Sequence, residues 1–166
     1  MFECRSIAIG SGIVAVTIDI VYIPSLSEGI FQKDTFLILD ADRVIIAMGS
    51  ICDVAEEVID YLNAKGEKVG LIKVRLYRPF RADKLIAALP ETCKKVAVLD
   101  RTKEPGALGE PLYLDVVAAL AKTGKQATVC GGRYGLGSKD TPPSSIFAVY
   151  EELKKDAPKP QFTLGI

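Results

Sequence analysis

The sequence predicts an α/β protein in which a doubly wound, mostly parallel sheet lies between two layers of helices. Three observations lead to this fold class. Short apolar runs alternate along the chain with longer segments that have one apolar face, which is the order of strands and helices in such sheets. Polar residues do not alternate with apolar ones along these runs, so both faces of the sheet are expected to be covered. Glycine and proline residues separate the two kinds of segment.

The stretch Arg43–Phe80 contains a complete strand, helix and strand. Val44–Met48 is an unbroken apolar run, and Val69–Leu76 predicts a second apolar strand. Two strands joined through a helix in this way form a right-handed parallel crossover. The rest of the chain is expected to extend the sheet from this unit.

The helix between these two strands has recognisable ends. Ser50, followed three residues later by Asp53, predicts a capping box in which the serine hydroxyl accepts hydrogen bonds from amides at the helix start. Gly66 predicts the end of the helix, because glycine readily adopts the left-handed conformation found there. The apolar face of the helix is expected to consist of Val54, Val58, Tyr61 and Leu62.

The same alternation continues after Phe80. The predicted elements are a helix over Ala82–Leu89, a strand over Val96–Leu99, a helix between Pro111 and Gly124, a strand over Ala127–Cys130 and a helix that opens at Thr141-Pro142-Pro143. Proline at the first helical position and glycine just past the end bracket the second of these helices in the expected sense. Its segment Leu112–Ala121 is apolar nearly all round, which predicts burial on two sides. The second side would meet another domain or subunit, or pack tightly inside one layer of the same domain.

The two ends of the chain differ from the rest. Residues 1–35 predict an irregular or short-strand extension. Within them, the apolar run Ser6–Ile23 is shorter than the roughly 20 residues of a membrane span and is interrupted by Gly10-Ser11-Gly12, so two short strands fit it better than a span or a secretory signal. Residues 36–157 are expected to form one α/β domain, and residues 158–166 a linker towards a following domain.

Composition excludes several classes of function. The chain has 166 residues, with 21 lysines and arginines balanced by 21 aspartates and glutamates, so charge gives no reason to expect a nucleic acid or an anionic membrane as a partner. It contains no histidine, which excludes Ser-His and Cys-His nucleophile pairs and the usual catalytic zinc sites within this chain. The four cysteines lie far apart and are expected to be reduced core thiols of a cytoplasmic protein.

Charged residues follow several of the predicted strands. Loops after successive parallel strands meet along one edge of the sheet, where ligands and partners bind. Loops are also exposed and charged in most proteins, so a solvated edge remains an alternative. The candidates for contacts with an anion or with another domain are Ser50, Arg78, Arg101, Lys103, Arg133 and Lys139.

The glycine-rich segment Gly131–Lys139 has an incomplete likeness to a phosphate loop. Gly132 and Gly137 have the right separation, but Ser138 stands where the lysine of that motif must be, and the next helix begins several residues too late. Nucleotide binding, a single anion contact by Arg133 or Lys139, and a purely structural loop all remain open.

Three sequence motifs, one of them this glycine-rich segment, carry a family resemblance. The segments VRLYRPF at Val74–Phe80, LDRTKEPG at Leu99–Gly106 and GGRYGLGSK at Gly131–Lys139 occur in the order found in pyruvate:ferredoxin (flavodoxin) oxidoreductases. The chain from about Phe36 onwards resembles the second domain of these enzymes, which is similar in fold to the C-terminal domain of transketolase. The resemblance implies a three-layer domain of an enzyme that oxidatively decarboxylates pyruvate, makes acetyl-coenzyme A and reduces ferredoxin.

The resemblance also implies that the chemistry belongs to other domains. The full enzyme uses thiamine diphosphate, iron–sulfur clusters and coenzyme A, whereas this chain lacks the Gly-Asp-Gly thiamine signature and the cysteine runs that hold clusters. No cofactor and no catalytic residue is therefore expected in this chain, and ferredoxin would be met only through the full enzyme. The chain is interpreted as a gene fragment or as a separately encoded subunit bound to the other domains. The alternative is an independent domain that binds a phosphate compound or coenzyme A.

Overall fold

The described part of the chain is built on one parallel sheet. The computed structural model describes residues 40–165, so the predicted extension over residues 1–35, with its apolar run, lies outside them. Within this range five strands run parallel in the order β2-β1-β3-β4-β5. The strands are β1 (Arg43–Ala47), β2 (Val69–Lys73), β3 (Lys95–Asp100), β4 (Thr128–Arg133) and β5 (Gln161–Thr163). The predicted α/β fold class is confirmed.

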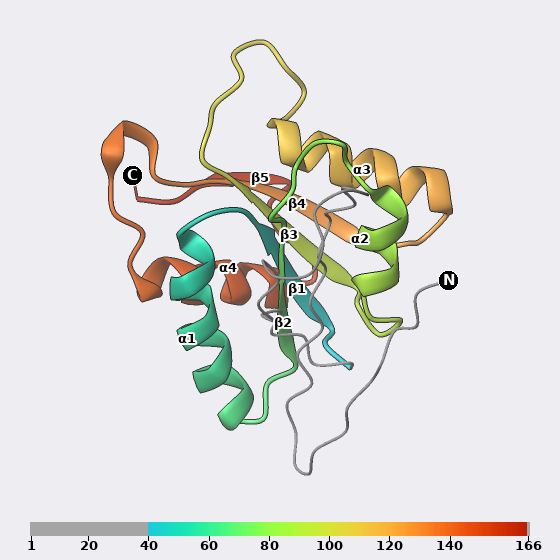
Figure 1. The fold of residues 1–166 in the computed structure, drawn as a ribbon. Helices are drawn as coiled ribbons and strands as arrows, with labels where there is room; N and C mark the ends of the chain where they lie inside the picture. The colour runs from blue at the N-terminus through green and yellow to red at the C-terminus, as the bar shows by residue number, and fades with distance from the viewer. Residues whose placement is uncertain (1–39, 166) are drawn as a thin grey trace, which may run out of the picture.

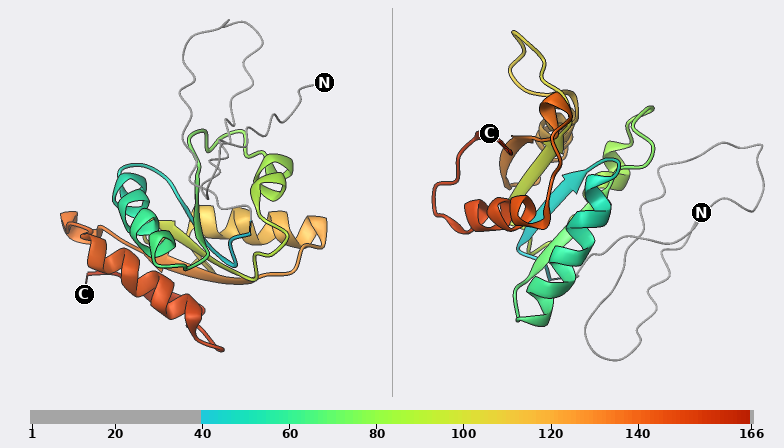
Figure 2. Two further views of the ribbon diagram at one scale, coloured as in Figure 1. Left: turned by 90° about the horizontal axis from the view of Figure 1, so that it is seen from below. Right: turned by 90° about the vertical axis from the view of Figure 1, so that its left-hand side faces the viewer.

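Helices cover both faces of this sheet. They are α1 (Ile51–Ala64), α2 (Ala82–Ala88), α3 (Pro111–Thr123) and α4 (Pro143–Lys154), and a single short 3-10 turn over Leu136–Ser138 precedes α4. Helices α1 and α4 pack on one face, and α2 and α3 pack on the other, which gives three layers (Figures 1 and 2).

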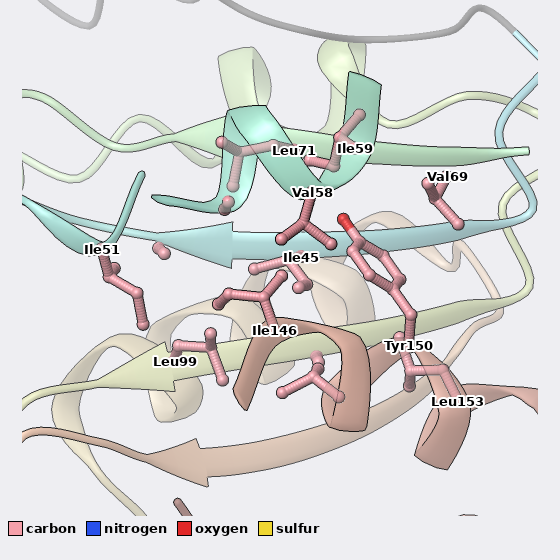
Figure 3. Close-up of a cluster of buried hydrophobic side chains, with 14 of the residues drawn as sticks. Ile45, Ile51, Val58, Ile59, Val69, Leu71, Leu99, Ile146, Tyr150 and Leu153 are labelled. Carbon is pink, nitrogen blue, oxygen red and sulfur yellow. The ribbon is translucent and has the colours of Figure 1, made fainter. Parts of the chain in front are cut away.

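The side chains of β1 alternate between the two cores. Ile45 lies beside Leu71 of β2 and Ala97 of β3, and all three face α1 and α4. Its neighbour Ile46 points to the opposite face, towards α2 and α3. Figure 3 shows the core under α1 and α4, in which the ring of Tyr150 lies flat against the sheet residues. The hydroxyl of this buried tyrosine donates a hydrogen bond to the Gly70 carbonyl at 2.9 Å, so no polar atom of its side chain is left unpaired.

The crossover from β4 to β5 has the opposite hand to the three before it. The chain moves from β1 to β2 with α1 on one face, and then from β2 to β3 and β4 in the other direction with α2 and α3 on the other face. These three crossovers share one hand, the right-handed one that parallel units adopt. From β4 to β5 the direction stays the same, but α4 returns to the face of α1. A sequence rule based on the usual hand would have placed α4 on the wrong side.

Strand β5 corrects the interpretation of the chain end. Residues 158–166 were expected to be a linker, but Gln161–Thr163 pair in parallel with Gly131–Arg133. The Gly131 amide donates to the Pro160 carbonyl at 2.8 Å, and the Leu164 amide donates to the Arg133 carbonyl at the same distance. This part of the segment therefore belongs to the sheet.

The ends of α1 agree with the sequence only in part. The capping box is wrong, because Ser50 is already in the helical conformation (φ −62°, ψ −22°) and its side chain makes no capping hydrogen bond. The C-terminal end is confirmed: Gly66 has φ 87°, and the amide after it donates to the Leu62 carbonyl at 3.1 Å. The predicted apolar face is also rotated, since Tyr61 is half exposed while Ala55 and Ile59 are buried.

Candidate functional site

The six candidate residues lie in three separate places. Ser50, Arg101 and Lys139 border a pocket at the carboxyl ends of the strands. Lys103 and Arg133 surround the carboxylate of Glu110 at the start of α3. Arg78 lies on the α2 and α3 side of the sheet, where it pairs with Asp115. The edge predicted from the sequence is therefore a set of distinct local arrangements, each with its own chemistry.

The pocket lies where the strand order reverses. It has a volume of about 260 Å³ and opens between the start of α1 and the ends of β3 and β4. In doubly wound sheets ligands bind at this switch point, here between β1 and β3. The lining residues are Ser50, Ile51, Val54, Arg101, Tyr134, Lys139, Asp140 and Thr141.

The two cations of the pocket differ in availability. Arg101 is exposed and makes no hydrogen bond or ion pair with any residue between 40 and 165. The Lys139 ammonium instead donates to the Gly165 carbonyl at 2.6 Å. Gly135, at φ 62°, lets the backbone pass close to Arg101, because a Cβ atom there would lie 2.9 Å from the arginine Nε. The guanidinium of Arg101 is thus the group of this pocket best placed to meet an anion.

Tyr134 forms a wall of the pocket and has no free hydroxyl. The side chain is buried, and its hydroxyl donates to the Met48 carbonyl at 3.0 Å. Burial raises the pKa of Tyr134 above its ordinary value. A buried phenol that is protonated and already hydrogen-bonded is a structural group, so the pocket offers binding contacts and no evident acid or base from this tyrosine.

Glu110 is the centre of an ionic cluster that the sequence analysis missed. Its side chain is only 3% exposed, and one carboxylate oxygen lies 2.6 Å from Arg133 Nε and 3.8 Å from Lys103 Nζ. Burial acts to raise the pKa of Glu110, but the hydrogen bond and charge of Arg133 outweigh it, so the pKa lies below the ordinary value. The charge of Arg133 is therefore engaged inside the domain. A glutamate directly before a helix-opening proline was the available sequence signal.

The cluster also includes the edge strand. Arg133 Nη2 donates to Gln161 Oε1 at 2.8 Å, and Gln161 Nε2 donates to the Leu108 carbonyl at 2.9 Å. Glu110 belongs to the start of α3, Arg133 to β4 and Gln161 to β5. One network thus connects the loop before α3 with the last two strands of the sheet.

The carboxylate at the end of β3 caps a helix. Asp100 is 3% exposed and accepts hydrogen bonds from the amides of Leu112 and Tyr113, both at 3.1 Å. Burial raises the pKa of Asp100, and these two amides act in the opposite direction. The first amides of α3 have no partners within the helix, and the Asp100 carboxylate satisfies two of them. This assigns Asp100 to the folding of α3 and not to chemistry on a substrate.

Arg78 has a different set of neighbours. Its guanidinium lies over the ring of Tyr77, 3.8 Å from the ring centroid, and Nη1 donates to Asp115 Oδ2 at 2.8 Å. The Tyr77 hydroxyl donates to the same oxygen at 2.7 Å. Burial, together with this hydrogen bond, raises the pKa of Tyr77 to about 12. The arrangement joins the β2–α2 connection to α3, and Arg78 stays 59% exposed.

The glycines of the phosphate-loop-like segment serve packing. Gly131 and Gly132 lie inside β4. A Cβ atom on Gly131 would meet the Tyr113 ring at 3.1 Å, and one on Gly132 would meet the Phe162 ring at 2.6 Å. Aromatic rings pack directly against both glycines, so the structural alternative is favoured for these two residues.

The cysteines of residues 40–165 show no sign of being reactive, and no cluster of metal ligands is found in this range. Cys52, Cys93 and Cys130 are free and buried, and burial raises the pKa of both Cys52 and Cys93 to about 11, which keeps these thiols protonated at neutral pH. In this range no three or more histidine, cysteine, aspartate or glutamate residues are grouped so that they could hold a metal ion. None of the helices in the same range has the length and apolar character needed to cross a membrane.

Comparison with known proteins gives a consistent family. The sequence profile described as pyruvate:ferredoxin oxidoreductase core domain II matches residues 41–146. The chain is 60% identical over 127 residues to the pyruvate:ferredoxin oxidoreductase of Moorella thermoacetica, with 76% of this chain and 11% of that enzyme covered. It is also 60% identical to a pyruvate-flavodoxin oxidoreductase of Nostoc sp. PCC 7119, over 76% of this chain and 31% of that sequence. The chain thus spans a small part of the length of these relatives.

A solved structure supports the fold. A 2-oxoglutarate:ferredoxin oxidoreductase from Magnetococcus marinus, determined with 2-oxoglutarate, coenzyme A and succinyl-CoA bound, superposes with a TM-score of 0.51. The match covers 70% of this chain and 18% of the other, at 22% sequence identity. At this identity the likeness shows the arrangement of the sheet and helices, and ligand positions are not carried over.

Proposed function

Because the chain belongs to the family of pyruvate:ferredoxin oxidoreductase core domain II, we propose that it works as a structural, interdomain part of such an enzyme. The full enzyme would oxidatively decarboxylate pyruvate to acetyl-coenzyme A and reduce ferredoxin. This domain would supply contact surface, and other domains or subunits would supply the reacting groups. Ferredoxin would be met only by the assembled enzyme.

The residues described here do not fit the redox cofactors of that enzyme. Their three cysteines are buried and lie on α1, on the connection before β3 and on β4, so they cannot jointly hold a cluster. Among the same residues no three or more histidine, cysteine, aspartate or glutamate side chains are grouped as metal ligands. No step of the reaction is therefore assigned to this domain. Buried free thiols are also consistent with the reducing cytoplasm as its location.

One observation carries the proposal: α3 is apolar on its outer side. The inner side of the helix packs on the sheet through Leu112 and Val116, which are fully buried. On the outer side, Leu114 is 38% exposed and Val117 is 36% exposed, and Ala118 and Ala121 continue the same row. We call these four residues the α3 stripe. A helix that packs on the sheet with one side has no need of an apolar second side unless another surface covers it.

A chimera of a related enzyme tests this function. The aligned segment of the Moorella thermoacetica enzyme is replaced by residues 40–165 of this chain, and pyruvate-dependent reduction of ferredoxin is measured. At 60% identity we expect an assembled enzyme with activity within about tenfold of the parent, because most contact residues would be preserved. A chimera that fails to assemble, although the separate 166-residue chain unfolds cooperatively, contradicts the proposal.

A second candidate function is favoured by the pocket beside Arg101. The Arg101 guanidinium has no ion-pair partner among residues 40–165 and lies at the switch point of a parallel sheet, so it is suited to a phosphate group, including that of coenzyme A. A ligand present at one hundred times its dissociation constant stabilises the fold by about 2.7 kcal/mol, which a thermal shift detects. Coenzyme A, thiamine diphosphate and inorganic phosphate are compared on the wild-type chain and on Arg101→Ala. No shift with any of them, or equal shifts in both proteins, rules this candidate out.

A further inference from the structure

The loop between β3 and α3 projects away from the sheet. It is the long yellow loop of Figure 1, and it also stands clear of the domain in the right-hand view of Figure 2. We call its residues Lys103–Gly109 the arm. From Lys103 to Leu108 every residue of the arm is exposed. An exposed excursion of this length is the kind of loop that carries contacts to ligands or partners.

The tip of the arm has a defined turn. The Ala107 amide donates to the Glu104 carbonyl at 3.2 Å, and Gly106 has φ 83°. Proline at the second position and a glycine of positive φ at the third are the features of a type II turn. Pro105 and Gly106 therefore fix the shape of the tip from its own sequence.

The base of the arm is held on both sides. Where the arm begins, Lys103 lies 3.8 Å from the buried Glu110 carboxylate. Where it ends, the Leu108 carbonyl accepts a hydrogen bond from Gln161 of β5, which is itself held by Arg133. The ionic cluster around Glu110 thus acts as a clamp on both ends of the arm and restricts the positions it can adopt. A clamped loop has less conformational entropy to lose when it binds.

The clamp presents a large apolar side chain to solvent. Leu108 is 90% exposed, the highest value among the large hydrophobic residues in the described range. Its backbone carbonyl accepts a hydrogen bond from Gln161, which ties this end of the arm to β5 and favours one position of Leu108. A single exposed leucine is common on protein surfaces, but Leu108 is tied to the sheet edge and lies next to further exposed apolar residues, so it is suited to act as an interface anchor.

The arm is continuous with the α3 stripe. Gly109 ends the arm directly against the helix, because a Cβ atom there would lie 2.4 Å from the Tyr113 ring and 3.5 Å from Leu114 Cδ2. Leu108 and Leu114 therefore belong to one surface. In the Moorella thermoacetica relative the matching segment makes up 11% of the enzyme, so most of that enzyme lies outside it and is available to cover such a surface.

We infer that the arm and the α3 stripe form one docking surface, and that its occupant is an apolar groove on another domain of the same oxidoreductase, with Leu108 inserted into the groove. This inference rests on the proposed function and specifies the surface and the anchor. The Glu110–Arg133–Gln161 clamp positions the anchor. A hydrophobic groove fits because the exposed side chains of the α3 stripe and the anchor itself carry no charge.

Side-chain footprinting in the chimera tests this surface. Hydroxyl-radical oxidation of Leu108 is measured in the separate 166-residue chain and in the assembled chimera. We expect oxidation in the chimera to be slower by about fivefold or more, because a hot-spot side chain is removed from water. In Gln161→Ala, which releases the Leu108 carbonyl, we expect this protection to be partly lost. Equal oxidation of Leu108 in the separate chain and in the assembled wild-type chimera overturns the inference.

A substitution that places a charge on the anchor residue Leu108 gives a second, functional readout. Leu108→Asp is compared with Tyr61→Asp, in which the same charge replaces a half-exposed aromatic side chain on α1. We expect Leu108→Asp to shorten the half-life of chimera activity on heating by about threefold or more, with Tyr61→Asp changing it less, and the separate Leu108→Asp chain to unfold like the wild type. Equal effects of the two substitutions overturn the inference. A wild-type chimera that does not assemble removes the proposed function and this inference together, whereas an assembled chimera with an exposed Leu108 removes the inference alone.

Discussion

The two helical layers of this domain pack on the sheet in the same way and differ on their outer sides. Beneath both layers the sheet residues and the inner helix residues are almost fully buried. The exposed residues on the outer side of α1 and α4 are mostly charged, among them Asp53, Glu57, Asp60, Glu151 and Lys154, with Tyr61 as a single half-exposed aromatic ring. The outer side of α3 carries the apolar α3 stripe. A covered sheet therefore does not require an apolar outer helix surface, and the α3 stripe is the surface to which the proposed interdomain contact is assigned.

Ionic links strengthen the same contrast. On the α1 and α4 side, Glu67 accepts from Arg43 at 2.6 Å and from Lys154 at 2.8 Å, which ties the start of β1 and the end of α4 to the turn before β2. This layer is closed by interactions within the domain. On the opposite side, the Glu110 cluster leaves the arm and Leu108 exposed. We call the α1 and α4 side the closed side and the α2 and α3 side the open side. The four predictions below test whether residues of the closed side contribute more to the free energy of unfolding, as expected if the outer residues of the open side serve contacts with other domains.

The largest effect is expected for Leu153→Ala on α4. Leu153 belongs to the core between the sheet and the layer of α1 and α4, and it is fully buried. Truncation therefore leaves a cavity and is expected to lower the free energy of unfolding by about 3 kcal/mol. The matched control on the open side is Leu114→Ala, for which we expect less than about 1 kcal/mol because this leucine is partly in water already. Urea denaturation of the 166-residue chain measures both. Equal losses at the two positions would break the comparison.

A smaller loss is expected for Arg133→Ala. The substitution leaves the buried Glu110 carboxylate without its main partner, and because Arg133 retains some solvent contact we expect about 2 kcal/mol, below the range for a fully buried pair. The pKa of folded Glu110 is lowered from 4.5, so the stability from this pair is present above that pH and is lost as pH falls through the lowered pKa. Wild type and variant should therefore differ at neutral pH and converge in strong acid. A difference that is independent of pH would show that the pair is not its source.

Asp100→Asn tests the cap of α3. Burial raises the pKa of folded Asp100 above 3.8, so ionisation of this group opposes folding, and its contribution to stability declines as pH rises from 3.8 through the raised pKa. The asparagine keeps one acceptor for the Leu112 and Tyr113 amides and loses the other, at a cost of about 1 kcal/mol. We expect this cost to be larger in acid than at neutral pH when urea denaturation is followed across that range. The opposite trend would contradict the assigned pKa direction.

The smallest effect is expected for Arg78→Ala. Its ion pair with Asp115 is exposed, and such pairs contribute little to folding, so the melting temperature of the separate chain should change by less than about 2 °C. Asp115→Asn, which removes the same pair from the other side, is the matched control. A loss of cooperative unfolding in Arg78→Ala would instead place this arginine among the residues that hold the β2–α2 connection to α3.

The sequence by itself determined the local elements. Apolar runs identified β1, β2, β3 and β4 to within a few residues, and Pro111, Gly66 and Gly124 marked helix ends that the structure confirms. These signals are local, because the pattern of burial along a strand or helix and the backbone freedom of glycine depend on neighbours in sequence. The three motifs that carry the family resemblance were also readable, and the family match confirms that resemblance.

Only the tertiary structure decided how the edge residues are grouped. Arg133 meets Glu110 because α3 begins beside the end of β4, and Gln161 completes the cluster because β5 joins that edge of the sheet. None of these residues is near the others in sequence, and a short strand such as β5 has too few residues to show a pattern. The opposite hand of the crossover from β4 to β5 also depends on the tertiary structure, because it is set by the face of the sheet on which α4 packs. Interactions between distant segments depend on sheet order and register, which no single stretch of this sequence encodes.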